Sequence, residues 1–493
     1  MRHLIFLVSS VLLSLISISC TSASREGLPP GSPFRASVVM KPEVLPQGIT
    51  VGDVTAHGAQ LWVRTEGPGL VQVEWAPSSV WEAASKMASV VAPVARTARM
   101  TTGPETDFTV TIPLEGAVPA TRYRYHVLVG RAVDGKDPIE AELAAQGEFT
   151  TLPDSLSSAP VVFAWSGDLG GQQRCRQGVG GYPIFDILRK QDLDFFLFLG
   201  DTIYSDDTCP SPPNEPGADF KASTLTEYRA RHRYQRGAES LSRFLESVPV
   251  YVIWDDHEVR NNFAGPFDDQ MPAGRQALRE YWPMASLPGD PHRMYRAVRY
   301  GADLELFILD TRQYRSRNAD QDGPAKTMLG VAQLRWLLDG LAHSTATWKV
   351  IASSVPLSIP KGGGASVPGY DGWAGGGPDG TGFERERQVI VDAILGQKLK
   401  NVVFLGGDVH WVQANAYDPN QDGIIDFHEF IAGPLSARPG RLTVASETLH
   451  PTRLINEDGY YNFGLARITK TSFELTVVDD AGKTRFSYRV TAR

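Results

Sequence analysis

Two patterns of apolar and polar positions divide the chain. Over residues 48–153, short runs such as AQLWVRTE, LVQVEWA and YRYHVLVG alternate apolar with polar side chains, and glycine, proline or aspartate turns separate them. Alternation with a period of two is typical of half-buried β-strands. Several short strands within roughly a hundred residues predict a small antiparallel sandwich of the fibronectin or immunoglobulin type.

A different pattern begins after the turn-rich stretch 154–160 (DSLSSAP), which we interpret as a domain boundary. Continuous apolar runs such as FFLFLG and VYVIW then alternate with helical patterns such as LTEYRARHRYQ, and alternating strands follow towards the C-terminus. Strands that alternate with helices predict an α/β fold. Because the last strands can complete a second sheet, we expect residues 160–493 to form a layered α/β sandwich flanked by helices.

The first twenty residues have the pattern of an export signal. MRHLIFLVSSVLLSLISISC joins basic residues to an apolar run that is short for a membrane span. The residues before Cys20 resemble a bacterial lipoprotein cleavage box, although Ser17 stands where a branched aliphatic residue is usual. We therefore expect a signal peptide over 1–20, a linker over 21–47, and a periplasmic or cell-surface protein with a lipid anchor at Cys20. An ordinary cleaved signal is the alternative.

Composition narrows the classes of partner. Lys and Arg number 48 and Asp and Glu 56, a formal net charge of −8, which argues against specific nucleic-acid binding but leaves room for a local phosphate pocket. Beyond Cys20, only Cys175 and Cys209 remain. In an exported chain these two can pair or stay free, and the sequence leaves both alternatives open.

Four apolar runs end in acids or histidine: VVFAWSGDLGG, FFLFLGDTIY, VYVIWDDHE and NVVFLGGDVH. A single aspartate after a strand more often caps the next helix, and a single histidine is more often structural. Four strands that deliver such groups together are costly to bury unless a cation neutralises them. The candidate residues are Asp168, Asp201, Tyr204, Asp255, Asp256, His257, Asn261, Asp408 and His410.

In this order, GDLG, GDTIY, DDHE and GGDVH resemble the signature blocks of the calcineurin-like metallophosphoesterases. WDDHEVRNN, LDTRQYR and GGDVHWV are similar to the alkaline phosphatase D (PhoD-like) group of that superfamily. The resemblance implies the layered metallophosphoesterase sandwich behind a small all-β domain. It also implies hydrolysis of small phosphate monoesters or diesters by a metal-activated water.

The resemblance further implies roles for single residues. Asp201 would bridge two metals, and His257 would be the catalytic proton donor at the phosphate. Asp168, Tyr204 and His410 would complete an Fe(III) site, and Asn261, Asp408 and, as a further candidate, Asp256 would hold a second cation, Ca²⁺, with Mn²⁺ or Mg²⁺ as alternatives.

Two departures from the better-known relatives refine the expected metals. Asp408 stands where many members have histidine, and Ser353 and Ser354 occupy the region of another histidine, so the second site becomes all-oxygen and favours calcium, magnesium or manganese over zinc. Members of the resembled group often carry a cysteine near the first block. Here Ser166 and Gly167 precede Asp168, and we expect a carboxylate in place of that thiolate.

Residues 418–429 (DPNQDGIIDFHE) match the calcium-binding loop pattern. The matching ligand positions are Asp418, Asn420, Asp422, Asp426 and Glu429. The flanking sequences are typical of strands rather than helices, so we expect a lone structural Ca²⁺ loop at a hairpin tip. A polar turn without an ion is the alternative.

Metal-dependent phosphoester hydrolysis is the function that these features favour. A phospholipase D-like diesterase is a related alternative. An exported calcium-binding adhesion protein would explain residues 48–153 and 418–429 but leaves the strand-ending acids without a role. The glycine-rich stretch 361–380 is interpreted as a mobile lid over the site or, alternatively, as a surface insertion.

Overall fold

The computed structural model describes residues 39–86, 94–130, 141–178, 180–287, 289–362, 369–375 and 380–493. The predicted signal peptide, Cys20 and residues 21–38 of the predicted linker lie outside these ranges. Among the helices within the ranges, none is both long and apolar enough to cross a membrane.

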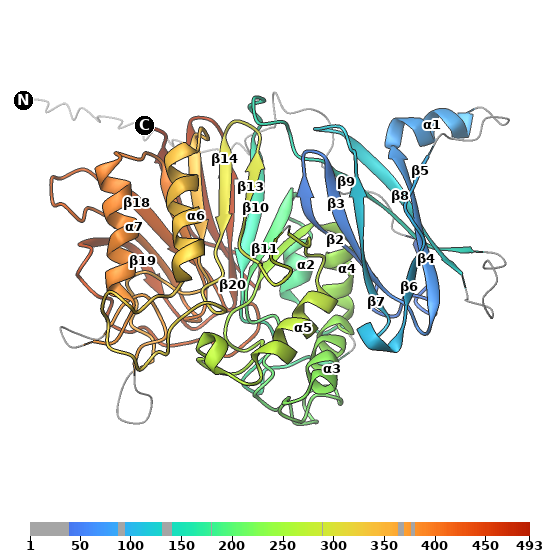
Figure 1. Cartoon of the computed structure of the whole chain (residues 1–493), viewed down its shortest axis with the longest axis horizontal. Coiled ribbons are helices and arrows are strands. Elements are labelled where there is room, and N and C mark those ends of the chain that lie inside the picture. Colours follow the sequence, from blue (N-terminus) through green and yellow to red (C-terminus); the bar gives the residue numbers. More distant parts are fainter. Residues whose placement is uncertain are drawn as a thin grey trace, which may run out of the picture. The chain divides into compact units, whose positions relative to one another are not determined.

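Three sheets carry the fold (Figure 1). The first has the order β1-β9-β8-β4-β5, with β6 also paired to β4, and comprises β1 (Val39–Met40), β4 (Gly69–Pro77), β5 (Ala95–Arg96), β6 (Met100–Thr102), β8 (Arg122–Gly130) and β9 (Glu142–Thr150). The second has the order β22-β21-β20-β10-β11-β12-β2-β3-β7 and comprises β2 (Ile49–Thr55), β3 (Gly58–Arg64), β7 (Thr109–Glu115), β10 (Val161–Ser166), β11 (Phe195–Leu199), β12 (Val250–Ile253), β20 (Asn462–Ile468), β21 (Ser472–Asp479) and β22 (Thr484–Thr491). The third has the order β13-β14-β15-β16-β18-β17-β19 and comprises β13 (Arg296–Tyr300), β14 (Leu304–Ile308), β15 (Trp348–Ala352), β16 (Val402–Gly406), β17 (Val412–Tyr417), β18 (Phe427–Ile431) and β19 (Pro451–Glu457).

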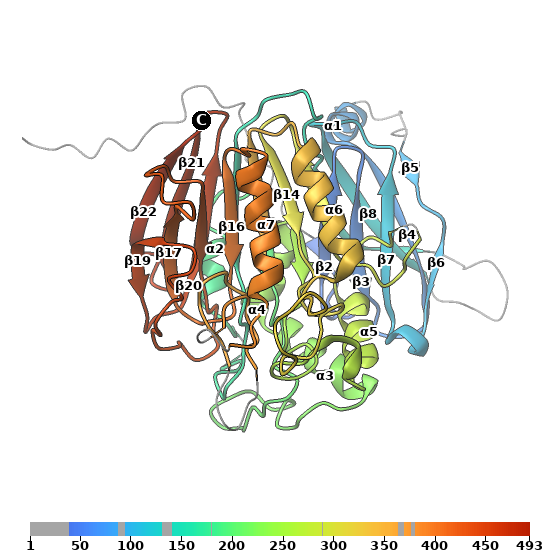
Figure 2. The same ribbon diagram turned by 60° about the vertical axis from the view of Figure 1, so that its left-hand side comes forward.

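Helices flank the sheets. They are α1 (Ser78–Lys86), α2 (Ile184–Leu188), α3 (Leu225–Arg236), α4 (Glu239–Ser247), α5 (Met271–Tyr281), α6 (Gly330–His343) and α7 (Glu384–Gly396), with short 3-10 helices at Pro104–Thr106 and Gly265–Phe267. Helix α1 contacts β4 and β8 of the first sheet. Figure 2 shows α6 and α7 in front of the third sheet, and their buried residues share one apolar cluster with that sheet. Phe244 of α4 packs on Phe196 of β11, on the outer side of the second sheet.

The inner faces of the second and third sheets pack on each other. Trp348 of β15 and Phe430 of β18 contact Phe473 of β21, with ring centroids 5.7 and 5.6 Å apart. The order helix, sheet, sheet, helix is the layered sandwich that the strand and helix patterns predict.

The segment before the boundary contributes to two sheets. Strands β2, β3 and β7 extend the second sheet, and β2 joins β12 in parallel through the pair Gly52 and Val250. The remaining strands of this segment form the first sheet. The N-terminal segment therefore forms two β-layers and the helix α1, and one of these layers is continuous with the large sheet.

The end of the predicted linker has fixed structure, which corrects that prediction for residues 39–47. Val39 and Met40 pair with β9 as β1, and Leu45 is completely buried in the main core. An apolar side chain loses contact with water on such packing, and this favours ordering over a free tether.

Candidate metal centre

The four predicted runs form strands whose carboxyl ends lie at one edge of the sandwich. β10, β11 and β12 are parallel neighbours in the second sheet, and β16 belongs to the third. Asp168, Asp201 and Asp408 follow these strands with φ angles of 61°, 51° and 69°, and His410 has 63°. Left-handed backbone is uncommon for residues other than glycine, and such residues cluster at functional sites.

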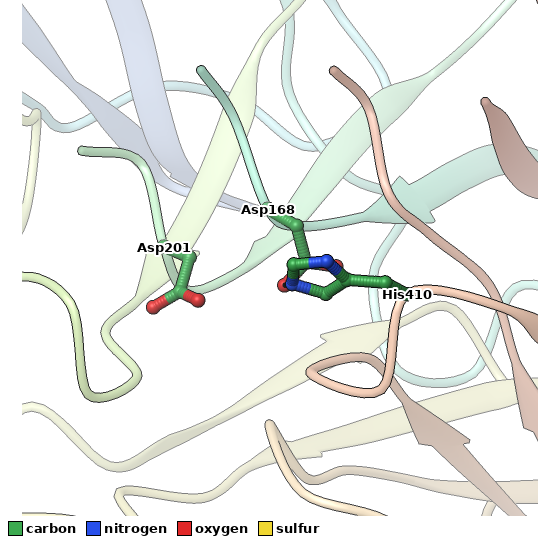
Figure 3. Close-up of side chains that lie close together, drawn as sticks. All are labelled: Asp168, Asp201 and His410. Carbon is green, nitrogen blue, oxygen red and sulfur yellow. Dashed lines mark ion pairs between the residues drawn. The ribbon is translucent and has the colours of Figure 1, made fainter. Parts of the chain in front are cut away.

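These turns bring the predicted ligands together. Three groups have ligand atoms that all lie within 4.8 Å of one another: Asp168, Asp201 and His410; Asp201, Asp256 and His257; and Asp255, Asp256 and Asp408. The groups share Asp201 and Asp256, so they form one continuous centre. Figure 3 shows the first group, in which the side chains come from three separate segments of the chain.

Tyr204 lies beside the first group and contacts His410. The Tyr204 hydroxyl lies 2.8 Å from His410 Nε2, and that nitrogen lies 3.3 Å from Asp168 Oδ1. His410 Nδ1 lies 2.7 Å from the Arg438 carbonyl oxygen, to which it donates. Because the proton sits on Nδ1, the lone pair of Nε2 is available to a metal ion.

Five buried carboxylate oxygens in the centre have no hydrogen-bond partner. They are Asp168 Oδ2, Asp201 Oδ2, Asp255 Oδ2, Asp256 Oδ1 and Asp408 Oδ2. An unpartnered buried carboxylate is expensive, whereas carboxylate oxygens are the ligands that hard cations prefer. The donor set therefore fits cations that bind between these residues.

In four of the five aspartates, the other carboxylate oxygen accepts a hydrogen bond from a protein N–H group. Asp201 Oδ1 accepts from the His257 backbone N–H at 3.0 Å, and Asp256 Oδ2 accepts from the Asn262 backbone N–H at 2.6 Å. Arg312 Nε donates to Asp255 Oδ1 at 2.5 Å, and Lys361 Nζ donates to Asp408 Oδ1. These contacts fix each carboxylate while its second oxygen stays free.

Without bound cations, burial and mutual repulsion destabilise the negative charges of the centre. Burial and the neighbouring Asp256 raise the pKa of Asp201 well above its usual range. Burial and Asp201 likewise raise the pKa of the Tyr204 hydroxyl. A bound cation reverses both effects, because it stabilises the anionic forms.

Asn261 does not lie in the centre. Its side chain is exposed, and its backbone N–H donates to Asp206 Oδ2 at 2.9 Å. The next residue, Asn262, has a buried Oδ1 without a partner and a φ of 58°. Because Asn262 is partly buried and its backbone N–H contacts Asp256, it replaces the exposed Asn261 as the candidate ligand.

Asp206 is a neighbour of the centre that the sequence analysis missed. His257 Nδ1 lies 2.6 Å from Asp206 Oδ1, and the His257 ring stacks on Tyr204 with centroids 4.1 Å apart. Burial by itself would lower the pKa of His257, but Asp256 and the hydrogen bond to Asp206 outweigh it and raise the pKa to about 9. The aspartate pair that ends GDTIYSDD was the available signal.

Glu258 organises two of the strand ends. Its carboxylate accepts from the backbone N–H groups of Asp201 at 3.0 Å, Thr202 at 2.6 Å and Asp255 at 2.9 Å. Burial raises the pKa of Glu258 to about 7. This side chain links the turns after β11 and β12 and so sets the spacing of Asp201 and Asp255.

Cys175 and Cys209 form a disulfide, which decides between the two alternatives left by the sequence. It joins the segment that follows Asp168 to the segment that follows Tyr204. The bond therefore braces two ligand-bearing turns.

The described part of the glycine-rich stretch is anchored, which corrects the mobile-lid interpretation for residues 369–375. Asp371 is completely buried, and Arg312 holds both of its oxygens at 2.7 Å while Arg315 donates at 2.8 Å. Arg312 also binds Asp255, so it connects this stretch to the centre. Residues 363–368 and 376–379 lie outside the described ranges.

The predicted calcium loop lies at a hairpin tip, between the antiparallel strands β17 and β18. Asp418 accepts from the backbone N–H groups of Asp422 and Gly423 at 3.1 and 2.9 Å. Asp426 has a buried Oδ2 without a partner, and burial followed by Asp422 and Asp418 raises its pKa.

Glu429 does not belong to this loop, and that prediction is wrong. Its carboxylate is buried and accepts from the Leu357 N–H at 2.6 Å, from Asn415 Nδ2 at 3.1 Å and from the Tyr417 hydroxyl. A helix after the loop would bring the twelfth position back to the ion, whereas β18 carries Glu429 into the core.

Comparisons with known proteins agree with this arrangement. A family model described as PhoD-like phosphatase matches residues 163–477, and one described as PhoD-like phosphatase, N-terminal domain, matches residues 34–153. Alkaline phosphatase D of Bacillus subtilis (strain 168) is 30% identical over 404 residues, which cover 74% of this chain and 64% of that protein. The match thus spans less than two thirds of the relative's length.

Two solved structures share the fold. One described as PhoD has a TM-score of 0.69 at 23% identity, and the match covers 92% of this chain and 93% of that chain. A purple acid phosphatase from yellow lupin (Lupinus luteus) seeds has a TM-score of 0.61 at 13% identity, with 91% and 75% covered. The predicted metallophosphoesterase fold behind a separate N-terminal domain is confirmed, and that domain contains the helix α1 in addition to its strands.

Proposed function

Because the chain belongs to the PhoD-like phosphatase family, we propose that it is a metal-dependent hydrolase of small phosphate monoesters and diesters. The observation that carries the proposal is the set of five buried, unpartnered aspartate oxygens. A non-enzymatic adhesion protein has no use for such a centre.

We propose two cation sites in this centre. Asp168, Tyr204 and His410 would hold Fe(III), and Asp255, Asp256, Asp408 and Asn262 would hold Ca²⁺, with Mn²⁺ or Mg²⁺ as alternatives and Asp201 between the sites. The tyrosine oxygen and imidazole suit iron, and the oxygen-only set suits a hard divalent ion. When bound, the cations supply a deprotonated water and polarise the phosphoryl group.

His257 is the proposed proton donor to the leaving oxygen. Asp206 engages its Nδ1, so the other ring nitrogen, Nε2, is the one that can give a proton to an alkoxide. The raised pKa keeps this imidazole protonated at neutral pH.

The proposal is tested with metal-loaded protein, an aryl phosphate monoester and an aryl phosphodiester. We expect hydrolysis that a chelator abolishes and that added cations restore. Activity that resists the chelator, or no turnover of either substrate, would contradict the proposal. Faster hydrolysis of a phospholipid headgroup than of both aryl substrates would favour the phospholipase D-like alternative.

The role of His257 predicts a shift in pH dependence. In the wild type, kcat/KM should fall as pH rises through the pKa of His257, because the protonated imidazole is the active form. Cations bound at Asp256 should place this limb below the value of about 9 that the cation-free centre gives. Asp206→Asn removes a contact that raises this pKa, so the falling limb should move to lower pH by about one unit. Asp207→Asn, which changes the neighbouring charge, is the control, and coincident limbs in all three proteins would exclude the role.

We also propose a structural Ca²⁺ in the hairpin loop, held by Asp418, Asn420, Asp422 and Asp426 without Glu429. The unpartnered Asp426 oxygen supports it. In addition to any event from the centre, calorimetric titration with calcium should show a binding event that Asp422→Ala loses and Glu429→Gln retains. Equal heats for Asp422→Ala and the wild type would leave the loop as a polar turn.

Export and a lipid anchor at Cys20 remain proposals based on the pattern of residues 1–20. The domain division at 154–160 is likewise kept as a proposal, supported by the gap between the two family matches.

A further inference from the structure

The two halves of the centre differ in the positively charged side chains that pair with their carboxylates. Among the described residues, no arginine or lysine forms an ion pair with Asp168 or Asp201, whose neighbours are His410 and a backbone N–H. In the other half, Arg312 pairs with Asp255, and Lys361 pairs with Asp408. Within the described part of the chain, the arginine and lysine ion pairs to the ligand carboxylates thus lie on the side of the proposed second cation.

Lys361 is well placed to act on that site. Its Nζ donates to the carbonyl oxygen of Asp408 at 2.7 Å and to Oδ1 of the same residue. Its side chain is 26% exposed, whereas that of Asp408 is 0% exposed, so the lysine covers the aspartate. Asp408 Oδ2 remains buried without a partner.

The backbone holds this lysine in position. The Asp371 N–H donates to the Lys361 carbonyl oxygen at 2.6 Å, and Gly362 pairs with Tyr370 in an isolated bridge. Asp371 itself is fixed by Arg312 and Arg315. The position of Lys361 therefore depends on a buried ion-pair network rather than on a free surface side chain.

We propose that Lys361 sets the charge of the Asp255, Asp256 and Asp408 site, so that this site takes a divalent ion and disfavours a trivalent one. The ammonium stays on Oδ1 of Asp408 while the ion binds Oδ2. Repulsion between a fixed ammonium and a bound ion grows in proportion to the charge of the ion. The inference rests on the proposed two-cation centre and adds a residue that selects the ion.

The experiment is calorimetric titration of chelator-treated protein with Ca²⁺ and, separately, with La³⁺. The binding event that Asp408→Asn loses is assigned to the second site. For Lys361→Met, we expect this event to tighten at least about tenfold for Ca²⁺ and about thirtyfold for La³⁺, because the effect on the free energy scales with the charge of the ion. Lys361→Arg should retain the wild-type affinities, and Lys400→Met, an exposed charge change on the loop before β16, should leave them unchanged.

Other results would overturn the inference. If Lys361 only positions Asp408, both ions should bind more weakly to Lys361→Met. An equal change in affinity for both ions would exclude selection by charge. Lys361→Gln is a second variant with the same expectation in case Lys361→Met folds poorly. If the wild type shows no event that depends on Asp408, the second cation site of the proposed function fails together with the inference.

Discussion

Replacing Asp201 by asparagine is expected to lower phosphatase activity by at least about 10³-fold. Asp201 belongs to two of the three ligand groups, so its loss weakens both proposed cation sites. Metal ions contribute several kcal/mol to stabilisation of the phosphoryl transition state, which corresponds to that factor. Steady-state kinetics and metal analysis of the purified variant provide the measurement.

Asp201→Asn also has an expected effect on stability that separates a functional from a structural role. An asparagine can still accept the hydrogen bond from the His257 N–H. It also removes a carboxylate whose charged form is disfavoured, because burial and Asp256 raise the pKa of Asp201. The metal-free variant should therefore unfold no more readily than the metal-free wild type. Asp339→Asn, an exposed change on α6, is the control. Full activity in Asp201→Asn would contradict the assignment of Asp201 as a metal ligand.

Replacing Arg312 by methionine is expected to cost about 3–5 kcal/mol of stability, the usual penalty when one partner of a buried ion pair is removed. Arg312 is completely buried and binds Asp255 and Asp371, which are buried as well. Its removal takes away the ion pair that Asp255 forms within the described part of the chain, whereas Asp371 keeps Arg315 and Asn318. Chemical denaturation of the metal-free protein gives the free energy of unfolding.

Two further variants show where the loss of stability in Arg312→Met comes from. Arg335→Met, on the exposed face of α6, should unfold like the wild type. The double variant Asp255→Asn with Arg312→Met should recover part of the loss, because it removes the carboxylate left unpaired. A change below about 1 kcal/mol in Arg312→Met, a value typical of surface pairs, would show that the network contributes little to stability.

The sequence predicted the parts of the centre that depend on local pattern. Apolar runs followed directly by Asp168, Asp201 and Asp408 indicated strand ends, and strand ends meet at one edge because β10, β11 and β12 are parallel. The alternation of strands and helices predicted the layered sandwich for the same reason. These features depend on residues that are close in the chain.

The remaining features depend on contacts between distant segments. Lys361 and Arg312 reach the centre from loops 47 and 57 residues away from their aspartate partners, and no spacing rule predicts such pairs. Asn261 and Asn262 differ by one position, and burial in the folded chain distinguishes them. The prediction that Glu429 binds calcium was wrong because the loop pattern assumes a following helix, whereas the chain continues as β18.

The junction between β2 and β12 has a consequence for how the protein can be divided. Through the pair Gly52 and Val250, the N-terminal segment covers a strand edge of the large sheet. A chain that began at the 154–160 boundary would leave that edge open, and an open edge is a template for pairing with another copy. We therefore expect a chain without the N-terminal segment to aggregate more readily than the full chain, which light scattering would show.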